Sequence, residues 1–489
     1  MTSGPLRKPG RTGVRIGGDR YQWLVAWSAC VSTLRGPDVE SNPVVAVGVE
    51  VDGVGNLDDV VVYRQAPPNT YIQVKYTVDS QHPVNGAYLT DPSKAGGPSI
   101  LEKIYTAWKD LSKSGDPAEL VLMTNRAPDP QDPLVSGRDA RTRLLLPNAS
   151  EGGPTSKKGV ARHQWTTAAK MRGGELTQLL EVLRFDLAHD VKHVEEKAGL
   201  QMLASGLRGD ADAVAVGIGW VEQQVIAGKR RITADEISDA VADLGLRQGQ
   251  SRSILSIATL TPDPLAAEAA HHLDWVDRFD GVDAPHKRRP LPPATWEQLQ
   301  DDIEAIPSHL VGATHVIVTG SMRLPTAFTV GATLRMVTNV DLAVVQRQDL
   351  WSTDTSYTEA VTPQIDTHQI GLGNDLAIVV QIAAPVHEDV LRFITEQQLP
   401  VDKLLVVSPP RGVNDKAISG SSAANALAFG IRNALRPQVR RYQSVHLFLA
   451  TPMGFALLLG HRWNAMGPTT VVYEDLVHLG YERAFTISA

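Results

Sequence analysis

Cysteine, long apolar segments and an excess of basic charge are all missing from this chain of 489 residues. Cys30 is the only cysteine, which excludes an intramolecular disulfide and a zinc site built from cysteines. No segment approaches the roughly 18 consecutive apolar residues that span a bilayer. Residues 1–13 are polar and basic, without the apolar core of a secretion signal. We therefore expect a cytoplasmic protein that makes no contact with a membrane.

The balance of charge excludes a chain that coats nucleic acid along its whole length. There are 47 basic and 54 acidic residues, a net charge of −7, so any basic surface must be local. One local excess lies at the N-terminus, where six basic residues precede residue 36 and Asp19 is the only acid. This excess predicts DNA contacts made by the N-terminal segment, although a tail that only aids solubility would have the same composition.

The length predicts two or three domains, and the composition of 43% hydrophobic and 21% charged residues is that of a folded protein. Residues 1–16 are expected to form a disordered basic tail. We expect a first domain at 17–250 and a second at 260–489. A proline-rich stretch at 284–293 is expected to be a surface connection.

The first domain has the pattern of a mixed α/β core with a helical extension. An apolar helix is expected at 21–34, followed by three strands at 44–51, 58–63 and 70–78 that are separated by turn-rich spacers. A further helix at 100–111 and a strand at 119–125 complete the core. Helices are expected at 174–185 and 234–244, and Thr233 and Glu236 form a capping box before the second.

The second domain alternates short apolar strands with helices, which is typical of a parallel sheet covered on both faces. Two Rossmann-like units in tandem would account for roughly 305–489. The strands are expected at 314–321, 339–346, 375–383, 403–410, 445–451 and 468–474, with helices at 388–397 and 423–435.

Candidate catalytic residues lie in the three strands of the first domain. Asp58 and Asp59 precede the second strand, and Gln73 and Lys75 share one face of the third because side chains alternate along a strand. A carboxylate beside an acid-x-lysine element is the pattern of nucleases that use divalent metal to activate water. Lysine adds positive charge near the scissile phosphate. The alternative is that these charges are ordinary solvated strand positions.

The segments VGVEVDGVGNLDDVVVY (47–63), YIQVKY (71–76) and ELVLMTN (119–125) resemble the Mrr-like branch of the PD-(D/E)XK nucleases. They are similar to the nuclease domain of effectors of bacterial CBASS anti-phage defence. The resemblance implies a restriction-endonuclease-like fold, a metal ligand at Asp59, a variant acid position at Gln73 and a catalytic lysine at Lys75. Asp58 is an alternative register for the ligand, and Glu50 is the best candidate for a second acid. The implied metal is Mg²⁺ or Mn²⁺.

The second domain resembles the SAVED domain, a fusion of two CARF-like Rossmann units. The resemblance rests on residues 314–335, on QRQDLW ending at Trp351, and on VHLFLATPMGFALLLGHRWN (445–464). SAVED domains sense cyclic oligonucleotides made by CD-NTase enzymes, so the resemblance implies a cyclic di- or trinucleotide as ligand. Fusions of this kind degrade double-stranded DNA when the signal binds.

Ligands of parallel α/β units bind at the carboxyl ends of the strands, beside helix N-termini that favour phosphate. Arg323 is expected to pair with a phosphate and Trp351 to stack on a base. The alternative is that the loops are ordinary turns and Trp351 is a core residue. The candidate ligand-binding residues are Gly320, Ser321, Met322, Arg323, Trp351, Ala384, Pro385, Thr451, Pro452 and Met453.

The sequence predicts a metal-dependent DNA endonuclease that a cyclic oligonucleotide activates. We expect activation to proceed by self-association of the chain in head-to-tail contacts. Two alternatives stay open: a restriction-type endonuclease without a signal, and a nucleotide sensor whose nuclease site is inactive.

Overall fold

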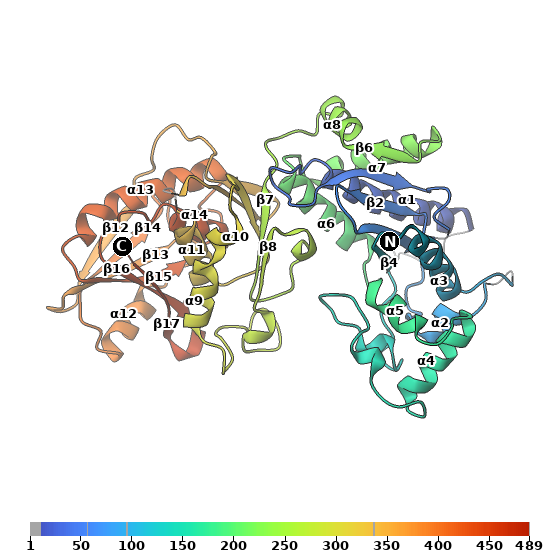
Figure 1. Ribbon diagram of the computed structural model, residues 1–489. Coiled ribbons are helices and arrows are strands. Elements are labelled where there is room, and N and C mark those ends of the chain that lie inside the picture. Colours follow the sequence, from blue (N-terminus) through green and yellow to red (C-terminus); the bar gives the residue numbers. More distant parts are fainter. Residues whose placement is uncertain (1–10, 56, 94–95, 336–337, 489) are drawn as a thin grey trace, which may run out of the picture. The chain divides into compact units, whose positions relative to one another are not determined.

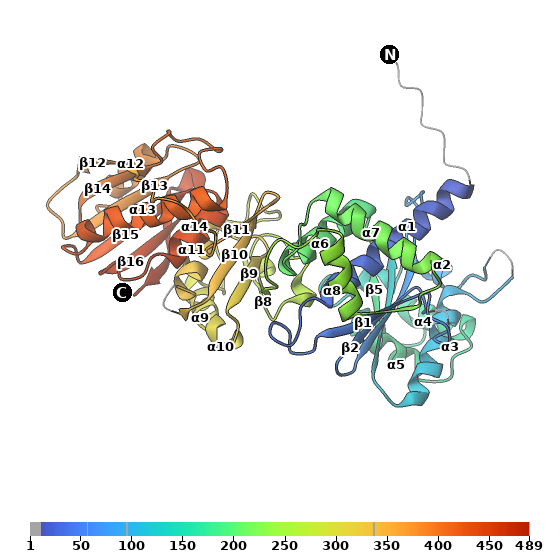
Figure 2. The ribbon, with the colours of Figure 1, turned by 90° about the horizontal axis from the view of Figure 1, so that it is seen from above.

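The computed structural model describes residues 11–55, 57–93, 96–335 and 338–488, which fold into two units, Met1–Gln250 and Ser251–Ala489 (Figures 1 and 2). The second unit begins before the expected boundary at residue 260. Its first strand, β7 (Ser253–Ala258), lies inside a sheet between two other strands, so a boundary at 260 would cut the sheet. Within the described residues, no helix has the length and apolar character needed to cross a membrane.

The first unit is built on a six-stranded sheet in the order β5-β4-β3-β2-β1-β6. Strands β1, β2 and β3 form the expected antiparallel meander, whereas β4 is parallel to β3 and β5 is parallel to β4. The strands are β1 (Val44–Val49), β2 (Val60–Arg64), β3 (Asn69–Lys75), β4 (Ala118–Thr124), β5 (Leu183–Asp186) and β6 (Arg231–Thr233).

Helices cover both faces of this sheet because alternate residues of the central strands are apolar on each side. Val121 and Met123 of β4 pack with α1, α6, α7 and α8, whereas Leu120 and Leu122 pack with α3, α4 and α5. The helices are α1 (Arg11–Ser32), α2 (Gly86–Thr90), α3 (Ile100–Leu111), α4 (Lys157–Ala168), α5 (Glu175–Val182), α6 (Val191–Ala204), α7 (Ala211–Ile226) and α8 (Ala234–Asp243).

Two expectations for the first unit are wrong. Helix α1 begins at Arg11, so the expected disordered tail does not reach residue 16, and residues 1–10 lie outside the described residues. The helix expected at 174–185 ends at Val182, because Leu183–Asp186 pairs with β4 as strand β5. The capping box is confirmed, since Thr233 and Glu236 each accept a hydrogen bond from the other's backbone N–H.

The second unit contains two sheets with parallel centres, in the orders β11-β10-β9-β7-β8 and β12-β14-β13-β15-β16-β17. The edge strands β11, β12 and β17 are antiparallel to their neighbours, whereas β8 is parallel to β7. The six expected strands are all present. Strands β7, β8, β11, β12 and β17 were not predicted from the sequence; β12, for example, is largely exposed and polar, so it has no apolar run. The remaining strands are β8 (His271–Asp274), β9 (His315–Thr319), β10 (Asp341–Gln346), β11 (Asp349–Ser352), β12 (Gln364–Gln369), β13 (Asp375–Gln381), β14 (Val401–Ser408), β15 (Ser444–Ala450), β16 (Thr469–Asp475) and β17 (Tyr481–Ile487).

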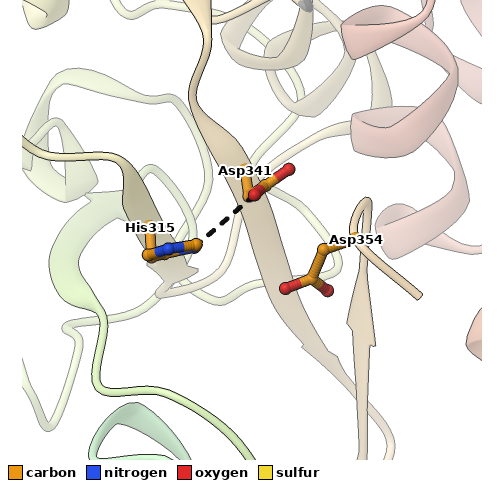
Figure 3. A group of neighbouring side chains, drawn as sticks. All are labelled: His315, Asp341 and Asp354. Carbon is orange, nitrogen blue, oxygen red and sulfur yellow. Dashed lines mark ion pairs between the residues drawn. The ribbon is translucent and has the colours of Figure 1, made fainter.

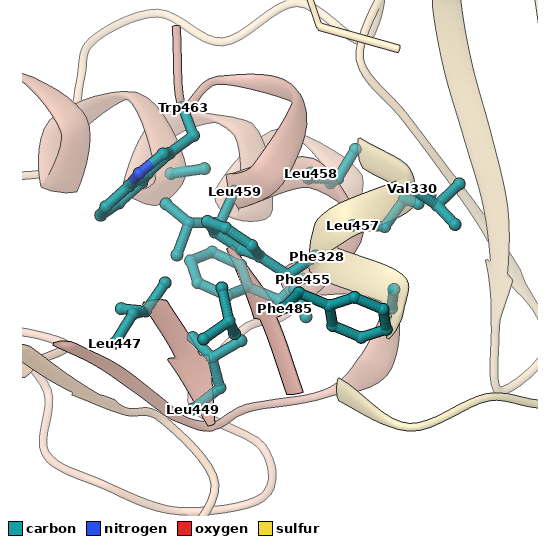
Figure 4. Packing of buried hydrophobic residues seen from close by; sticks show 14 of the residues in the cluster. Phe328, Val330, Leu447, Leu449, Phe455, Leu457, Leu458, Leu459, Trp463 and Phe485 are labelled. Carbon is teal, nitrogen blue, oxygen red and sulfur yellow. The ribbon is translucent and has the colours of Figure 1, made fainter. Parts of the chain in front are cut away.

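Helices α11 and α14 pack against each other between the two sheets, with Phe328, Phe455 and Trp463 in one apolar cluster (Figure 4). The helices are α9 (Trp296–Glu304), α10 (Ile306–His309), α11 (Leu324–Thr333), α12 (His387–Glu396), α13 (Ser421–Val439) and α14 (Met453–His461). Short 3₁₀ turns lie at Ser112–Ser114, Val135–Gly137, Asn148–Ser150, Ala266–Glu268, Val276–Arg278 and Val477–Leu479.

The stretch at 284–293 is more than the expected surface connection. The Lys287 side chain is buried, and its Nζ donates to the carbonyls of Val276 and Phe279 at 2.5 and 3.3 Å. Burying an ammonium requires such acceptors, so the segment has a defined conformation within the second unit.

Candidate functional site

Asp59, Gln73 and Lys75 come together at the junction of β2 and β3. The backbone N–H of Val74 donates to Asp59 Oδ2 at 2.7 Å, and Gln73 Nε2 donates to the same oxygen. Lys75 Nζ lies 3.8 Å from Asp59 Oδ2 and donates to the Val74 carbonyl at 3.2 Å. Period-two alternation puts Gln73 and Lys75 on the same face of β3 as Tyr71, which packs toward α3.

Burial dominates the electrostatics of this group. It raises the pKa of Asp59 above its usual value, although the Lys75 charge and the Val74 N–H act in the opposite direction. Burial also lowers the pKa of Lys75, and the charge of Lys103 on α3 adds to that effect, while Asp59 opposes it. Each charge is costly alone and is stabilised by the other, as at sites where ionisation is tuned for chemistry.

Glu50 and Asp58 do not extend this group into a carboxylate cluster. Glu50 has a positive φ of 49°, and its carboxylate accepts a hydrogen bond from Arg230 Nη1 at 3.0 Å. Among the described residues, no three carboxylate or imidazole groups converge around Asp59. The donor set is therefore one carboxylate, Asp59, and the amide oxygen of Gln73. Mg²⁺ keeps several waters and is commonly held by one or two carboxylates, so this set fits a minimal site.

At the carboxyl end of β9, Gly320 and Ser321 pack against the end of β7 and the loop that follows it. Gly320 has a φ of 88°, and a Cβ there would lie 2.2 Å from the Ile257 carbonyl oxygen. The Ser321 carbonyl accepts from the N–H groups of Thr259 and Leu260 at 2.9 and 3.2 Å. Met322 is buried in the core. The two neighbouring strand exits are thus joined by hydrogen bonds, and the buried Met322 is not accessible to a ligand.

The Arg323 side chain already forms hydrogen bonds within the second unit. Its guanidinium donates to the carbonyls of Lys287 at 2.6 Å and Ala284 at 2.9 Å, and lies 3.6 Å from Glu474. Phosphate pairing by Arg323, as the sequence analysis expects, would need these contacts to be exchanged. Glu474 and the segment around Lys287 were not singled out from the sequence, because the run Lys287-Arg288-Arg289 has the composition of a linker.

The exits of β13 and β15 are adjacent, because these two strands pair in parallel up to Gln381 and Ala450. Ala384 and Pro385 are exposed, Thr451 is buried, and Pro452 and Met453 are half-buried at the start of α14. The N–H of Gly454 in the first turn of α14 donates to Gln346 Oε1 at 2.8 Å. Gln346, at the end of β10, thereby links the first of the two sheets to the start of α14.

Trp351 lies in the core. It is 5% exposed, and its Nε1 is buried without a hydrogen-bond acceptor among the described residues. Stacking on a base needs an accessible ring face, so the expectation for Trp351 is wrong in this conformation and the alternative of a core aromatic fits.

His315, Asp341 and Asp354 are the three-membered group of possible metal ligands within the described residues, with ligand atoms within 4.8 Å of one another (Figure 3). His315 Nδ1 lies 3.5 Å from Asp341 Oδ2. Arg252 Nη2, however, donates to Asp354 at 2.9 Å and already neutralises that carboxylate. We interpret the group as an ion network at the start of β9 and β10.

Comparison with known protein families gives a match within the second unit. Residues 299–487 match the SAVED family, described as the SMODS-associated and fused to various effectors sensor domain. The match begins inside α9 and spans strands β9 to β17. The prediction of a SAVED sensor is confirmed for these residues.

The chain is also similar to CD-NTase-associated protein 4 of Enterobacter hormaechei subsp. hoffmannii, with 24% identity over 494 residues and 93% of each chain covered. Among solved structures, the chain is similar to the Cap4 SAVED/CARF-domain containing receptor of Acinetobacter baumannii with the cyclic trinucleotide 2'3'3'-cAAA. The two share 14% identity with a TM-score of 0.43, and the match covers 99% of this chain and 100% of that chain. The Cap4 receptor of Moraxella osloensis has 15% identity and a TM-score of 0.42, covering 97% and 100%.

Proposed function

We propose that this chain is a CBASS anti-phage effector: a metal-dependent endonuclease for double-stranded DNA that is activated when the SAVED region binds a cyclic oligonucleotide. One observation carries the proposal. The chain that matches a SAVED sensor over 299–487 also holds, in a separate unit, the Asp59, Gln73 and Lys75 constellation that resembles a PD-(D/E)XK site. The relative named CD-NTase-associated protein 4 supports a link to the enzymes that make such signals.

The order of elements supports a nuclease in the first unit. A helix, three antiparallel strands, two further helices and a strand parallel to the third follow one another as α1, β1 to β3, α2 and α3, and β4. This is the element order of restriction-endonuclease-like cores. It leaves Asp59, directly before β2, beside Lys75 at the end of β3, where one phosphodiester can reach both.

In this proposal Asp59 and the amide oxygen of Gln73 hold Mg²⁺ or Mn²⁺, which when bound activates water for attack on a phosphodiester. Lys75 places a positive charge beside the scissile phosphate. Asp59 holds the Lys75 ammonium at 3.8 Å and, through Val74, fixes the backbone of β3. Glu50 could join the metal only by releasing Arg230.

The contact between Glu50 and Arg230 favours a second candidate function, a cyclic-oligonucleotide sensor whose nuclease site is inactive. With Gln73 in the acid position and Glu50 paired to Arg230, Asp59 is the one acid in the hydrogen-bonded group. One carboxylate gives a weak site for a divalent cation, because affinity rises with the number of charged ligands.

A plasmid-cleavage assay separates the two candidates. The purified chain is incubated with supercoiled plasmid and Mg²⁺, with and without a panel of cyclic di- and trinucleotides, and with EDTA as a control. The proposal expects cleavage only when both metal and one cyclic nucleotide are present. Binding of a cyclic nucleotide without cleavage under any metal would select the inactive sensor. Cleavage at the same rate with and without every cyclic nucleotide would select an endonuclease that needs no signal.

Activation by self-association belongs to the same proposal. Assembly on the ligand would bring several nuclease units onto one duplex and raise their effective concentration. Sedimentation velocity with the cognate nucleotide is expected to show a larger species than the free protein. Cleavage that switches on without a change in sedimentation would rule assembly out.

A further inference from the structure

The second unit contains a long segment without negative charge in an acidic protein. Between Asp415 and Glu474 the chain has no aspartate or glutamate, yet it carries Lys416 and five arginines. The whole chain has a net charge of −7, so this segment departs strongly from the rest. The basic side chains are almost all arginine, whose planar guanidinium suits bidentate contacts with phosphate.

Helix α13 packs beside α14 (Figure 2). Three of these arginines, Arg432, Arg436 and Arg462, lie close to one another at this contact. Arg432 and Arg436 are one turn apart on α13 and so share a face of the helix. Arg462 is the C-cap residue of α14, and its Nη2 donates to the Thr353 carbonyl at 3.1 Å and to Asn425 Oδ1 at 3.4 Å. Arg432 donates to the Asn464 carbonyl at 3.4 Å.

No carboxylate in the described part of the chain forms an ion pair with Arg432 or Arg436. The contacts of Arg432 are neutral oxygens of Asn433 and Asn464 at 3.4 Å. The Nε atoms of Arg432 and Arg436 are buried and have no hydrogen-bond acceptor. Burying a hydrogen-bond donor without an acceptor costs free energy of folding. Two such donors on neighbouring guanidinium groups therefore indicate a place where a hydrogen-bond acceptor could bind.

The electrostatics agree with this geometry. Burial, followed by the charges of Arg436 and Arg462, lowers the pKa of Arg432. The C-terminal ends of α13 and α14 carry partial negative charge that offsets part of the repulsion. The charge of Asp341 offsets part of the charge of Arg462. Within the described residues, however, no carboxylate is among the charges that act on Arg432, so an anion would reduce the repulsion between these arginines.

We propose that Arg432, Arg436 and Arg462 form a binding site for phosphate groups, at the contact of α13 with α14. The phosphate belongs either to a small polyphosphate ligand or to the backbone of a nucleic acid; the chemistry of recognition is the same. This site is distinct from the strand-exit loops of the sensor and does not depend on the nuclease.

The test measures binding of two probes to the full chain in EDTA, where no metal-dependent cleavage can occur. Inorganic pyrophosphate is titrated by calorimetry, and a fluorescein-labelled 20-base-pair duplex by anisotropy. The variant is Arg432→Gln with Arg436→Gln. Its matched control is Arg347→Gln with Arg392→Gln, which removes the same charge from exposed arginines of the same unit that pair with Asp415 and Asp389.

We expect the double variant to lose roughly ten-fold or more in affinity for the probe it recognises, while the control keeps wild-type affinity. For a duplex, the slope of log K against log salt should fall by about two, since each phosphate contact contributes about 0.9. Loss of pyrophosphate binding alone identifies a small ligand, whereas loss of duplex binding identifies a nucleic-acid backbone.

A wild-type chain that binds neither probe, or a double variant that binds both as the wild type does, overturns the proposal. So does an equal loss in the control, which would show a general charge effect. Equal melting temperatures verify the fold of each variant. The single variant Arg436→Gln, which removes a guanidinium whose buried Nε has no acceptor among the described residues, replaces the double variant should that one melt early.

Discussion

Gly331 of α11 and Gly460 of α14 lie where the two helices cross, and neither position has room for a side chain. A Cβ on Gly331 would come within 2.1 Å of the Leu457 carbonyl oxygen, and one on Gly460 within 2.0 Å of the Phe328 carbonyl oxygen. The crossing closes the core between the two sheets of the second unit (Figure 4). Small residues at this point are therefore a condition for the two Rossmann-like halves to pack together.

Gly460→Ala should destabilise the second unit by about 1–3 kcal/mol or more, because the methyl group meets backbone atoms that cannot move without separating the helices. The measurement is thermal unfolding of the full chain. Gly219→Ala is the matched control. That glycine lies in α7 with nothing within 4 Å of its Cβ position, so alanine there should stabilise by roughly 0.5–1 kcal/mol. Equal melting of both variants would contradict the packing argument.

Lys75→Ala should abolish metal-dependent DNA cleavage, with a loss of roughly 10²-fold or more, because it removes the positive charge beside Asp59. Binding of the cyclic nucleotide should be unchanged, since the sensor is a separate unit. Lys113→Ala serves as the control, because that lysine is 75% exposed and pairs with Asp110 on the surface. Wild-type cleavage by folded Lys75→Ala protein would refute the nuclease assignment.

Glu474 should make the second unit less stable as the pH rises. Burial raises its pKa from 4.5 to about 8, and the arginines that oppose this lie at 3.6 Å (Arg323) and 4.0 Å (Arg288), too far for hydrogen bonds. Between these two pH values the folded state keeps a proton that the unfolded state has released. Stability therefore falls across this window, by at most about 1.4 kcal/mol per pH unit.

Glu474→Gln is a neutral mimic of the protonated acid and should remove this pH dependence. The melting temperatures of wild type and variant are compared from pH 5 to pH 8. We expect the wild type to fall relative to the variant as the pH rises, with the smallest difference near pH 5. Parallel curves would mean that Glu474 is ionised in the folded protein.

Trp351→Phe should leave cyclic-nucleotide affinity unchanged, because the ring is 5% exposed and its Nε1 makes no hydrogen bond that phenylalanine would lose. Trp351→Ala should cost about 3–5 kcal/mol of stability through the cavity it creates. Calorimetric titration on protein checked for folding distinguishes the roles. A Trp351→Phe protein that is stable but binds the nucleotide poorly would restore the base-stacking role.

Local patterns proved reliable wherever the interaction is itself local. Helix α3 has the bounds expected from its apolar spacing, and Ser99 accepts the N-terminal hydrogen bond from Glu102. The capping box of α8 depends on two residues three positions apart, and both of its hydrogen bonds are present. In the second unit, six near-continuous apolar runs became buried strands, because such runs have few other ways to avoid water.

Local sequence patterns did not predict interactions between residues that are distant in the chain. Leu183–Asp186 continues an apolar helical spacing in sequence, yet it becomes a strand because the edge of β4 offers backbone hydrogen bonds. Arg323 looked free to bind phosphate, but a segment 36 residues earlier supplies the carbonyl of Lys287 as its acceptor. Glu50 looked available to a metal until Arg230, 180 residues later, was found beside it.

The sequence by itself determined the kinds of elements, the division into an N-terminal α/β unit and a SAVED-like half, and the placement of Asp59, Gln73 and Lys75 on adjoining strands. Tertiary structure alone decided which charged and aromatic side chains are accessible. Trp351, Arg323 and Lys287 carry no local signal of burial; the acceptors of the Arg323 guanidinium, for example, are carbonyls 36 and 39 residues earlier in the chain. Desolvation depends on everything that packs around a group, whereas periodicity and capping depend only on its neighbours in sequence.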